Sequence, residues 1–146
     1  EIAQCLVGSE MCIRDSSYLD EIAQLHQQAF SDAEETLEAS RRYITEALKD
    51  SDGLLYILLK EAQVIGVCTV DLSGNNNYLY GLAVAEAYRG QCYGSYLAKS
   101  VVNQLIAQND KSFQIAVEDS NIGAKRLYEK IGFVKQTQVV YLKQKE

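Results

Sequence analysis

Residues 82–95 read LAVAEAYRGQCYGS, which predicts a strand that passes through a short loop into a helix. Backbone N–H groups converge in a glycine-containing loop of this kind, and the helix dipole favours negative charge there, so the loop can bind an anion. Arg89 adds a fixed cation suited to a pyrophosphate. The stretch lacks both the GxxxxGK pattern of a P-loop and the GxGxxG pattern of a dinucleotide site. Taken alone, such a turn is more often only a turn.

The rest of the chain predicts a single α/β (α+β) domain. The periodicity of apolar residues and the turn residues between them give the following expected elements. They are helices over 18–30, 37–50, 94–109 and 121–131, and strands over 54–60, 64–72, 78–84, 112–117 and 139–142. Because 54–72 reads as a hairpin and the later strands alternate with helices, we expect a mixed, mostly antiparallel central sheet flanked by helices.

Composition excludes several classes of protein. The 146 residues are 47% hydrophobic and 23% charged, as in ordinary globular domains. No apolar run approaches the length of a membrane span. A net charge of −6 argues against a nucleic-acid partner, which would need clustered Lys and Arg. After residues 1–16 are set aside, as argued below, only Cys68 and Cys92 of the four cysteines remain. They have no CxxC spacing and fit a reducing cytoplasm, so we expect a cytoplasmic domain with no membrane or nucleic-acid partner.

The first sixteen residues are set aside from the functional argument. Residues 5–16 read CLVGSEMCIRDS, which resembles the translation of a sequencing adapter, and EIAQ at 1–4 recurs at 21–24. The alternative is that residues 11–15 form an authentic first strand. We therefore assign 1–16 to an artefactual segment, which should contribute little to stability, and 17–146 to the functional domain.

A second motif follows the expected strand at 112–117. Residues 118–133 read EDSNIGAKRLYEKIGF. Together the two segments resemble the GNAT superfamily of acyl-CoA-dependent N-acetyltransferases, over roughly residues 17–146. Arg89-x-x-Cys92-x-Gly94 lies where that family has its R/Q-x-x-G-x-G/A pyrophosphate loop, and 121–133 lies on its second motif without a gap. Both motifs at this separation make the resemblance specific.

The resemblance implies how acetyl-CoA, with no metal, would bind as co-substrate. Leu82, Ala83 and Val84 would bind the pantetheine arm through their backbone. A bulge near Gly81 would splay this strand from 115–117 and open a cleft. An N–H near Leu82 would stabilise negative charge on the thioester oxygen. The pyrophosphate would lie on the loop residues Arg89, Gly90, Gln91, Cys92, Tyr93, Gly94 and Ser95.

The same resemblance implies roles for two residues of the second motif. Asn121 would hold the cofactor from the opposite strand end, although it is a good helix N-cap whatever it binds. Tyr128 would protonate the departing CoA thiolate, because a phenol with a pKa near 10 suits a thiol of similar basicity. The alternative for Tyr128 is a core aromatic residue with a hydrogen-bonded hydroxyl.

Several positions depart from the family pattern. Cys92 replaces a loop glycine, so its Cβ could crowd the phosphates. Glu86 stands where a proline is common. No carboxylate lies within 78–84, and Ala116 occupies the other strand position that often carries the general base. Glu118 is the nearest candidate base, and a relay of water with backbone carbonyls is the alternative.

These implications add up to an N-acetyltransferase that moves an acetyl group from acetyl-CoA to a primary amine by direct attack. The alternative function is a CoA-binding or regulatory domain that has lost turnover. The acceptor would be a small-molecule or peptide amine, and the chain a monomer or homodimer. Tyr80, Tyr93 and Tyr96 could line the acceptor pocket. We expect His26 on the surface and Glu34, Glu35 and Glu38 in a solvated first helical turn or at the rim of an acceptor site.

Overall fold

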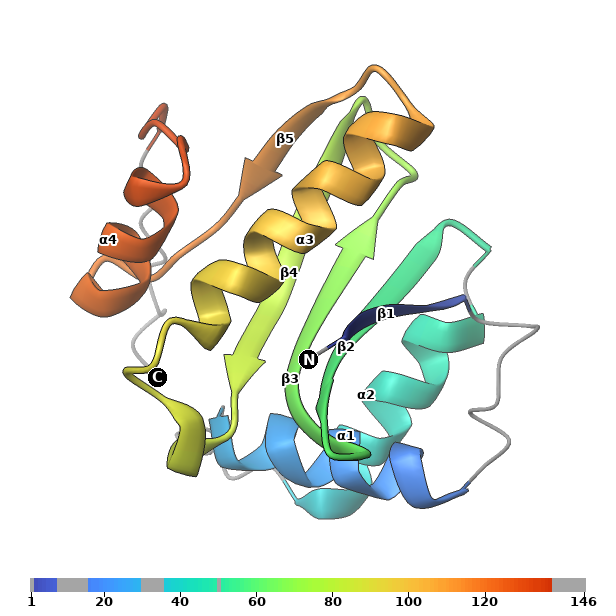
Figure 1. Cartoon of the computed structure of the whole chain (residues 1–146). Helices are drawn as coiled ribbons and strands as arrows, with labels where there is room; N and C mark the ends of the chain where they lie inside the picture. Colours follow the sequence, from blue (N-terminus) through green and yellow to red (C-terminus); the bar gives the residue numbers. More distant parts are fainter. Residues whose placement is uncertain (1, 8–15, 30–35, 50, 138–146) are drawn as a thin grey trace, which may run out of the picture.

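The computed structural model describes residues 2–7, 16–29, 36–49 and 51–137. In chain order its elements are β1 (Ile2–Val7), α1 (Ser16–Ala29), α2 (Leu37–Lys49), β2 (Gly53–Lys60), β3 (Gln63–Asp71), β4 (Asn76–Val84), the 3-10 turn η2 (Glu86–Tyr88), α3 (Tyr93–Gln108), β5 (Ser112–Ile115) and α4 (Ile122–Lys130). The strands form one sheet in the order β1-β2-β3-β4-β5 (Figure 1). Only the β4–β5 pair is parallel among these strands. The predicted single-domain, mostly antiparallel sheet with flanking helices is confirmed.

Two apolar cores lie on opposite faces of this sheet. Successive strand residues point to opposite faces, and both faces of β2 and β3 are apolar. Helices α1 and α2 cover one face, where the core includes Ile22, Ile44, Leu55, Ile57 and Val67. Helix α3 covers the other, where the core includes Leu58, Ile65, Leu79, Leu97 and Val101 (Figure 1). None of the described helices is long and apolar enough to cross a membrane.

The ends of most elements lie within two residues of their predicted places. Strand β5 is at the limit of this margin, because it ends at Ile115 rather than at residue 117. The expected closing strand at 139–142 lies outside the described residues, as do Glu34 and Glu35. Glu38 lies in the first turn of α2, as expected.

The prediction that His26 lies on the surface is wrong. Its side chain is only 7% exposed. The Nδ1 atom lies 3.2 Å from Oγ of the buried Ser40, and the ring stacks on Tyr43 at 4.8 Å between centroids. The pattern of α1 alone marks this position as polar. Packing of α2 against it buries the imidazole, because Ser40 is small and offers a polar partner.

Strand β1 comes from the segment that the sequence analysis sets aside. All of Ile2–Val7 pairs antiparallel with β2, at one edge of the sheet. Residues 11–15, the alternative first strand, lie outside the described part of the chain. The assignment of 1–16 as an artefactual segment stays a prediction.

Candidate active site

Strand β4 contains the predicted bulge. Val67 pairs with Ala83 and Thr69 pairs with Tyr80, so Cys68 of β3 faces both Gly81 and Leu82. Gly81 takes up this irregularity at φ +63°, in the left-handed region that glycine tolerates. The bulge predicted near Gly81 is therefore confirmed.

Strands β4 and β5 separate next to the bulge. The last residues that pair are Leu79 and Ile115, although β4 continues to Val84. Among the described strands, the remainder of β4 therefore has no partner on its β5 side. Leu82, Ala83 and Val84 present a strand edge there, with backbone groups that an extended ligand arm could bind.

The loop after β4 has the geometry of an anion site. Gly90 lies at φ +74° and Cys92 at φ +67°, and Cys92 occupies the N-cap position of α3. No side chain in the described part of the chain caps this helix. The N–H groups of its first turn therefore remain available to a bound anion. The positive φ of Cys92 is one that glycine adopts most readily, and the R/Q-x-x-G-x-G/A pattern has a glycine at this position.

Two side chains of the loop fold back onto backbone. Arg89 donates a hydrogen bond from Nε to the carbonyl oxygen of Val84 at 2.9 Å. Gln91 donates from Nε2 to the carbonyl of Ala87 at 3.2 Å. The exposed Arg89 is thus tethered at the end of β4, and its two terminal nitrogens can still donate to a phosphate.

Gly94 lies where β4, α3 and α4 meet. A Cβ added to it would be 3.0 Å from Leu127 Cδ1 and 3.6 Å from Val84 Cγ2. The absence of a side chain therefore lets α4 approach the end of β4. This approach brings Tyr128, the neighbour of Leu127, toward the sheet.

Tyr128 is 8% exposed and packs edge-to-face against Phe133, with 6.1 Å between ring centroids. Burial is the main cause that raises its pKa to about 12. No hydrogen bond joins the hydroxyl to the described part of the chain, in contrast to the satisfied core residue of the alternative interpretation.

The raised pKa changes one part of the expected chemistry. An ordinary phenol has a pKa near 10, which would match the leaving thiol. At about 12 the Tyr128 phenol is a weaker acid, and it stays protonated throughout the neutral range. It can therefore donate a hydrogen bond or a proton, but full transfer to a thiolate of pKa near 10 is uphill by about 3 kcal/mol.

Asn121 and Glu118 lie in the turn that precedes α4. The Oδ1 atom of Asn121 accepts a hydrogen bond from the N–H of Ala124 at 3.1 Å, so the expected N-cap is confirmed. Its N–H donates to the carbonyl of Glu118 at 2.9 Å. The carboxylate of Glu118 is exposed, beyond the end of β5. Its role as a base stays a prediction.

The three tyrosines expected near the acceptor lie on two elements, Tyr80 on β4 and the other two on α3. Tyr80 projects from β4 and stacks with Tyr78 at 5.8 Å between centroids. Tyr96 is 42% exposed on α3. Tyr93 accepts a hydrogen bond at its hydroxyl from Lys60 Nζ at 2.7 Å. Lys60 is not predicted from the sequence, because nothing in the pattern of β2 shows that its last residue contacts Tyr93 at the start of α3.

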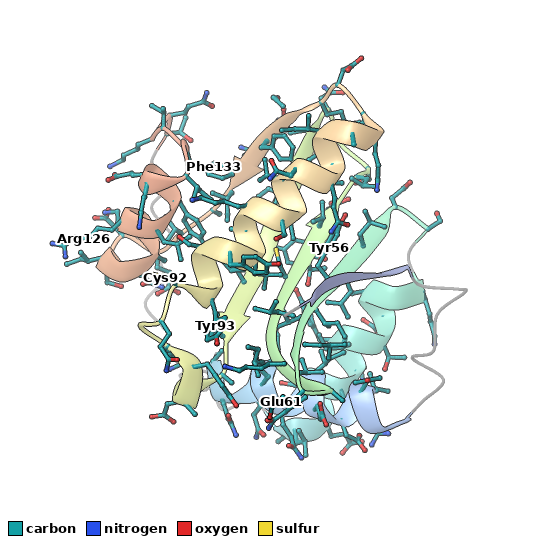
Figure 2. The ribbon with its side chains drawn as sticks, in the orientation of Figure 1. Tyr56, Glu61, Cys92, Tyr93, Arg126 and Phe133 are labelled. Carbon is teal, nitrogen blue, oxygen red and sulfur yellow. The ribbon has the colours of Figure 1, made fainter. Side chains whose placement is uncertain are left out.

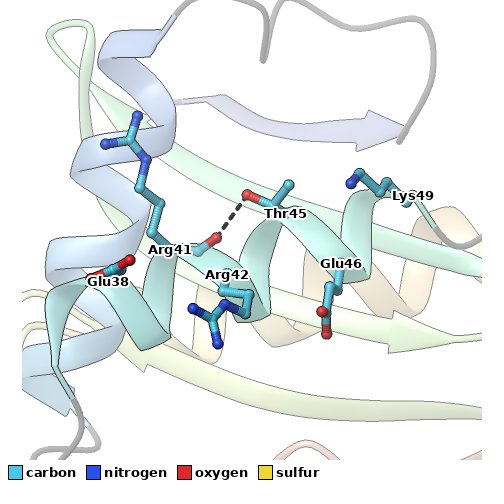
Figure 3. A pocket seen from close by; sticks show the side chains of 6 residues that line it. All are labelled: Glu38, Arg41, Arg42, Thr45, Glu46 and Lys49. Atoms are coloured by element: carbon cyan, nitrogen blue, oxygen red, sulfur yellow. Dashed lines mark hydrogen bonds between the residues drawn. The ribbon is translucent and has the colours of Figure 1, made fainter.

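A shallow hollow elsewhere is separate from this site. It is lined by side chains of α2: Glu38, Arg41, Arg42, Thr45, Glu46 and Lys49 (Figure 3). Within it, the Thr45 hydroxyl donates to the carbonyl of Arg41 at 2.7 Å. Since α2 covers the face of the sheet opposite to α3, this hollow does not adjoin the loop at 89–95.

Comparisons with known proteins agree with this geometry. The model of the acetyltransferase (GNAT) family matches residues 19–133. The chain therefore belongs to the GNAT family of acetyltransferases, as its two motifs indicate.

One curated relative is the ribosomal protein bS18-alanine N-acetyltransferase of Haemophilus ducreyi. It is 29% identical over 89 residues, which are 59% of this chain. The match spans 61% of the relative's length.

Solved structures of GNAT-type enzymes share the fold. An aminoglycoside acetyltransferase from an uncultured soil metagenomic sample, solved with sisomicin, has a TM-score of 0.76 at 14% identity, over 99% of this chain and 95% of that one. The aminoglycoside 6'-N-acetyltransferase of Acinetobacter haemolyticus has a TM-score of 0.75 at 15% identity, over 100% and 99%. An aminoglycoside N-acetyltransferase solved in complex with CoA has a TM-score of 0.76 at 13% identity, over 98% and 93%. At these identities the likeness is one of fold.

Proposed function

We propose that this chain transfers an acetyl group from acetyl-CoA to a primary amine by direct attack, without a covalent enzyme intermediate. The observation that carries the proposal is the separation of β4 from β5 after the Leu79–Ile115 pair. Among the described residues, it leaves one edge of β4 without a partner strand, and the loop after β4 leads into the N-terminus of α3, which no described side chain caps. One strand thus offers backbone partners to an extended amide-containing arm and, at its end, donors to a pyrophosphate.

The residues of the loop fit the phosphates of CoA. Positive φ values at Gly90 and Cys92 are the kind of backbone conformation in which successive N–H groups can bind an anion, and Arg89 adds a cation at the end of β4. Gln91, Tyr93, Gly94 and Ser95 complete the segment at 89–95. Asn121 uses its Oδ1 atom to cap α4, so we assign any contact with the cofactor to its Nδ2 group.

Groups of this chain would assist the transfer at three points. Bound acetyl-CoA supplies the activated acetyl thioester. The N–H of Leu82, within the bulge, donates to the thioester oxygen as negative charge develops there, a contact typically worth about 10²–10³ in rate. Tyr128 holds the proton that the leaving thiolate requires. Glu118, or water held by backbone carbonyls, accepts the proton that the attacking amine loses.

The acceptor is a small-molecule or peptide amine. The relative in Haemophilus ducreyi is named for a protein alanine, and the structural neighbours are named for aminoglycosides. A net charge of −6 favours the approach of cationic amines of either kind. We propose a cytoplasmic location, supported by the free Cys68 and Cys92 thiols, and a monomeric or homodimeric state.

A second candidate function is a CoA-binding regulatory domain without turnover. Two observations favour it. Cys92 is a non-glycine residue at φ +67° in the loop, and β4 offers no carboxylate as a base. In this case CoA would bind but no acetyl group would move.

An acetyl-transfer assay beside a binding measurement distinguishes the two functions. The chain is incubated with acetyl-CoA and, separately, an alanine-terminated peptide, an aminoglycoside, a polyamine and free amino acids. Released CoA thiol and acetylated amine are both quantified, because hydrolysis would release thiol alone. We expect equal amounts of both with at least one amine. Calorimetric binding of CoA without any acetylated amine would favour the regulatory domain, and no CoA binding would contradict both.

A further inference from the structure

Lys60 contacts residues at both ends of the loop segment 89–92. Its Nζ atom donates a hydrogen bond to the Tyr93 hydroxyl at 2.7 Å and lies 5.2 Å from the centroid of that ring. It also lies 5.6 Å from the centroid of the Tyr88 ring. Tyr88 directly precedes Arg89, and Tyr93 directly follows Cys92. The Lys60 ammonium group therefore contacts both of the tyrosines that flank residues 89–92.

The two tyrosines form a compact unit around this ammonium. Their rings meet edge-to-face, with 5.8 Å between centroids and 78° between planes. Both are half-buried and pack against the core beneath α3. Cation–π attraction to the Tyr88 ring and the charge-assisted hydrogen bond to the Tyr93 hydroxyl both strengthen in partly desolvated surroundings. Lys60 therefore fixes the side chains that anchor the loop.

Lys60 ends β2, directly before a tight two-residue turn into β3. Lys60 pairs with Gln63, and Glu61 and Ala62 between them have φ values of 51° and 62°. Two residues with positive φ join the strands of a hairpin tightly, although non-glycine residues adopt this conformation at a cost. Figure 2 shows Tyr93 between Cys92 and this turn, which Glu61 marks.

The loop needs such support. Gly90 and Cys92 both lie in the left-handed region, which a residue with a Cβ seldom adopts, and no side chain among the described residues caps α3. We propose that Lys60 is a positioning residue that holds the loop at 89–95 in its anion-binding conformation by acting through Tyr88 and Tyr93. This inference rests on the proposed binding of the CoA pyrophosphate by that loop.

The test compares a ligand with phosphates and one without them. Lys60→Met keeps most of the aliphatic stem but removes the charge and the donor. We expect it to raise the Kd for CoA and the KM for acetyl-CoA about tenfold. The kcat at saturating acetyl-CoA and the kcat/KM with S-acetylpantetheine, which has no phosphates, should stay within twofold. Lys60→Arg, which keeps a cation, should restore most of the affinity for CoA.

Two further variants separate positioning from other effects. Lys49→Met, an exposed position on α2, removes the same charge away from the loop and should leave CoA affinity unchanged. Tyr93→Phe keeps the ring but loses the acceptor, and should weaken CoA binding about threefold. In the double variant, Tyr93→Phe should add nothing to Lys60→Met, because the two residues act through one hydrogen bond. If Lys60→Met lowers the melting temperature too far to assay, Tyr93→Phe alone carries the test.

Three results would overturn the inference: unchanged CoA affinity in Lys60→Met, an equal loss with S-acetylpantetheine, or an equal loss in Lys49→Met. For Tyr93→Phe tested alone, an unchanged Kd for CoA has the same meaning. Failure of the proposed function has a different signature, because the unaltered chain would then either bind no CoA or bind it without acetylating any amine. In the second case the Kd for CoA still tests the role of Lys60.

Discussion

Tyr128 is both a buried residue and the proposed proton donor to the leaving thiolate. Replacing it with Phe keeps the ring and its contact with Phe133, so the fold and CoA affinity should survive. Only the proton donor is lost. We therefore expect kcat to fall by about 10²–10⁴, the usual range for a positioned general acid. Steady-state kinetics and thermal melting on the same preparation make the measurement.

The pH dependence of the unaltered enzyme provides a check on this role. Because burial raises the pKa of Tyr128 to about 12, the phenol stays protonated well above pH 10. The donor should therefore impose no alkaline fall in kcat below that pH. If Tyr128 is instead only a packed residue, the Phe variant will lose about 1 kcal/mol or less of stability and keep a near-normal kcat.

Cys92 holds a backbone conformation that suits glycine better than cysteine. At φ +67° a residue with a Cβ is disfavoured by about 1–2 kcal/mol relative to glycine. A glycine at this position would recover only part of that free energy, because it also gives the unfolded chain more conformational freedom. We expect Cys92→Gly to stabilise the chain by up to about 1 kcal/mol in urea unfolding and to tighten CoA binding in calorimetry. Cys92→Ala, which keeps the Cβ, is the matched control and should change neither quantity. Weaker CoA binding by the glycine variant would refute crowding by the side chain.

Ala62, in the turn between β2 and β3, is also a non-glycine residue with a positive φ. It lies at φ +62° in an exposed two-residue turn, so Ala62→Gly should stabilise the chain by roughly 0.5–1 kcal/mol. The control is Ala107→Gly at an exposed position of α3, which should destabilise it by a similar amount, since glycine weakens helices. Urea unfolding of the two variants should give shifts of opposite sign. Shifts of the same sign would mean that the turn is not under backbone strain.

The N-terminal strand gives a second prediction about an element. Strand β1 pairs with β2 at the sheet edge, and the loop at 89–95 adjoins β4. Removing residues 1–15 should leave the Kd for CoA within twofold and lower the melting temperature by only a few degrees, roughly what a loss of about 1 kcal/mol produces in a domain of this size. Loss of the cooperative transition would show that the segment is an integral part of the domain.

The pattern of apolar residues predicts most elements, because the spacing of apolar residues along a helix or strand follows the face that is buried. The bulge near Gly81 follows from the family motif rather than from periodicity. Burial of His26 could not be predicted, because the polar partner that α2 supplies is invisible in the pattern of α1. The early end of β5 at Ile115 depends on its divergence from β4, and not on its own propensity.

Across the whole molecule, the site is an assembly of elements that are distant in sequence. Motif spacing predicts the loop at 89–95 and Tyr128, since both lie in continuous segments. It cannot predict Lys60, whose contact with Tyr93 spans 33 positions, nor the raised pKa of Tyr128, which arises from packing. Contacts of this kind depend on the order of strands in the sheet, so only the folded chain reveals them.

The central claim is that acetyl-CoA binds along β4, with its phosphates at the loop and its thioester at the bulge. A crystal structure of the complex with acetyl-CoA tests this claim most directly. We predict pyrophosphate oxygens within about 3 Å of the N–H groups that begin α3, the typical length of such a bond. The thioester oxygen should lie within hydrogen-bonding distance of the N–H of Leu82, and the thioester sulfur should face the hydroxyl of Tyr128. Phosphates bound away from residues 89–95, or a thioester that does not reach the gap between β4 and β5, would contradict the account.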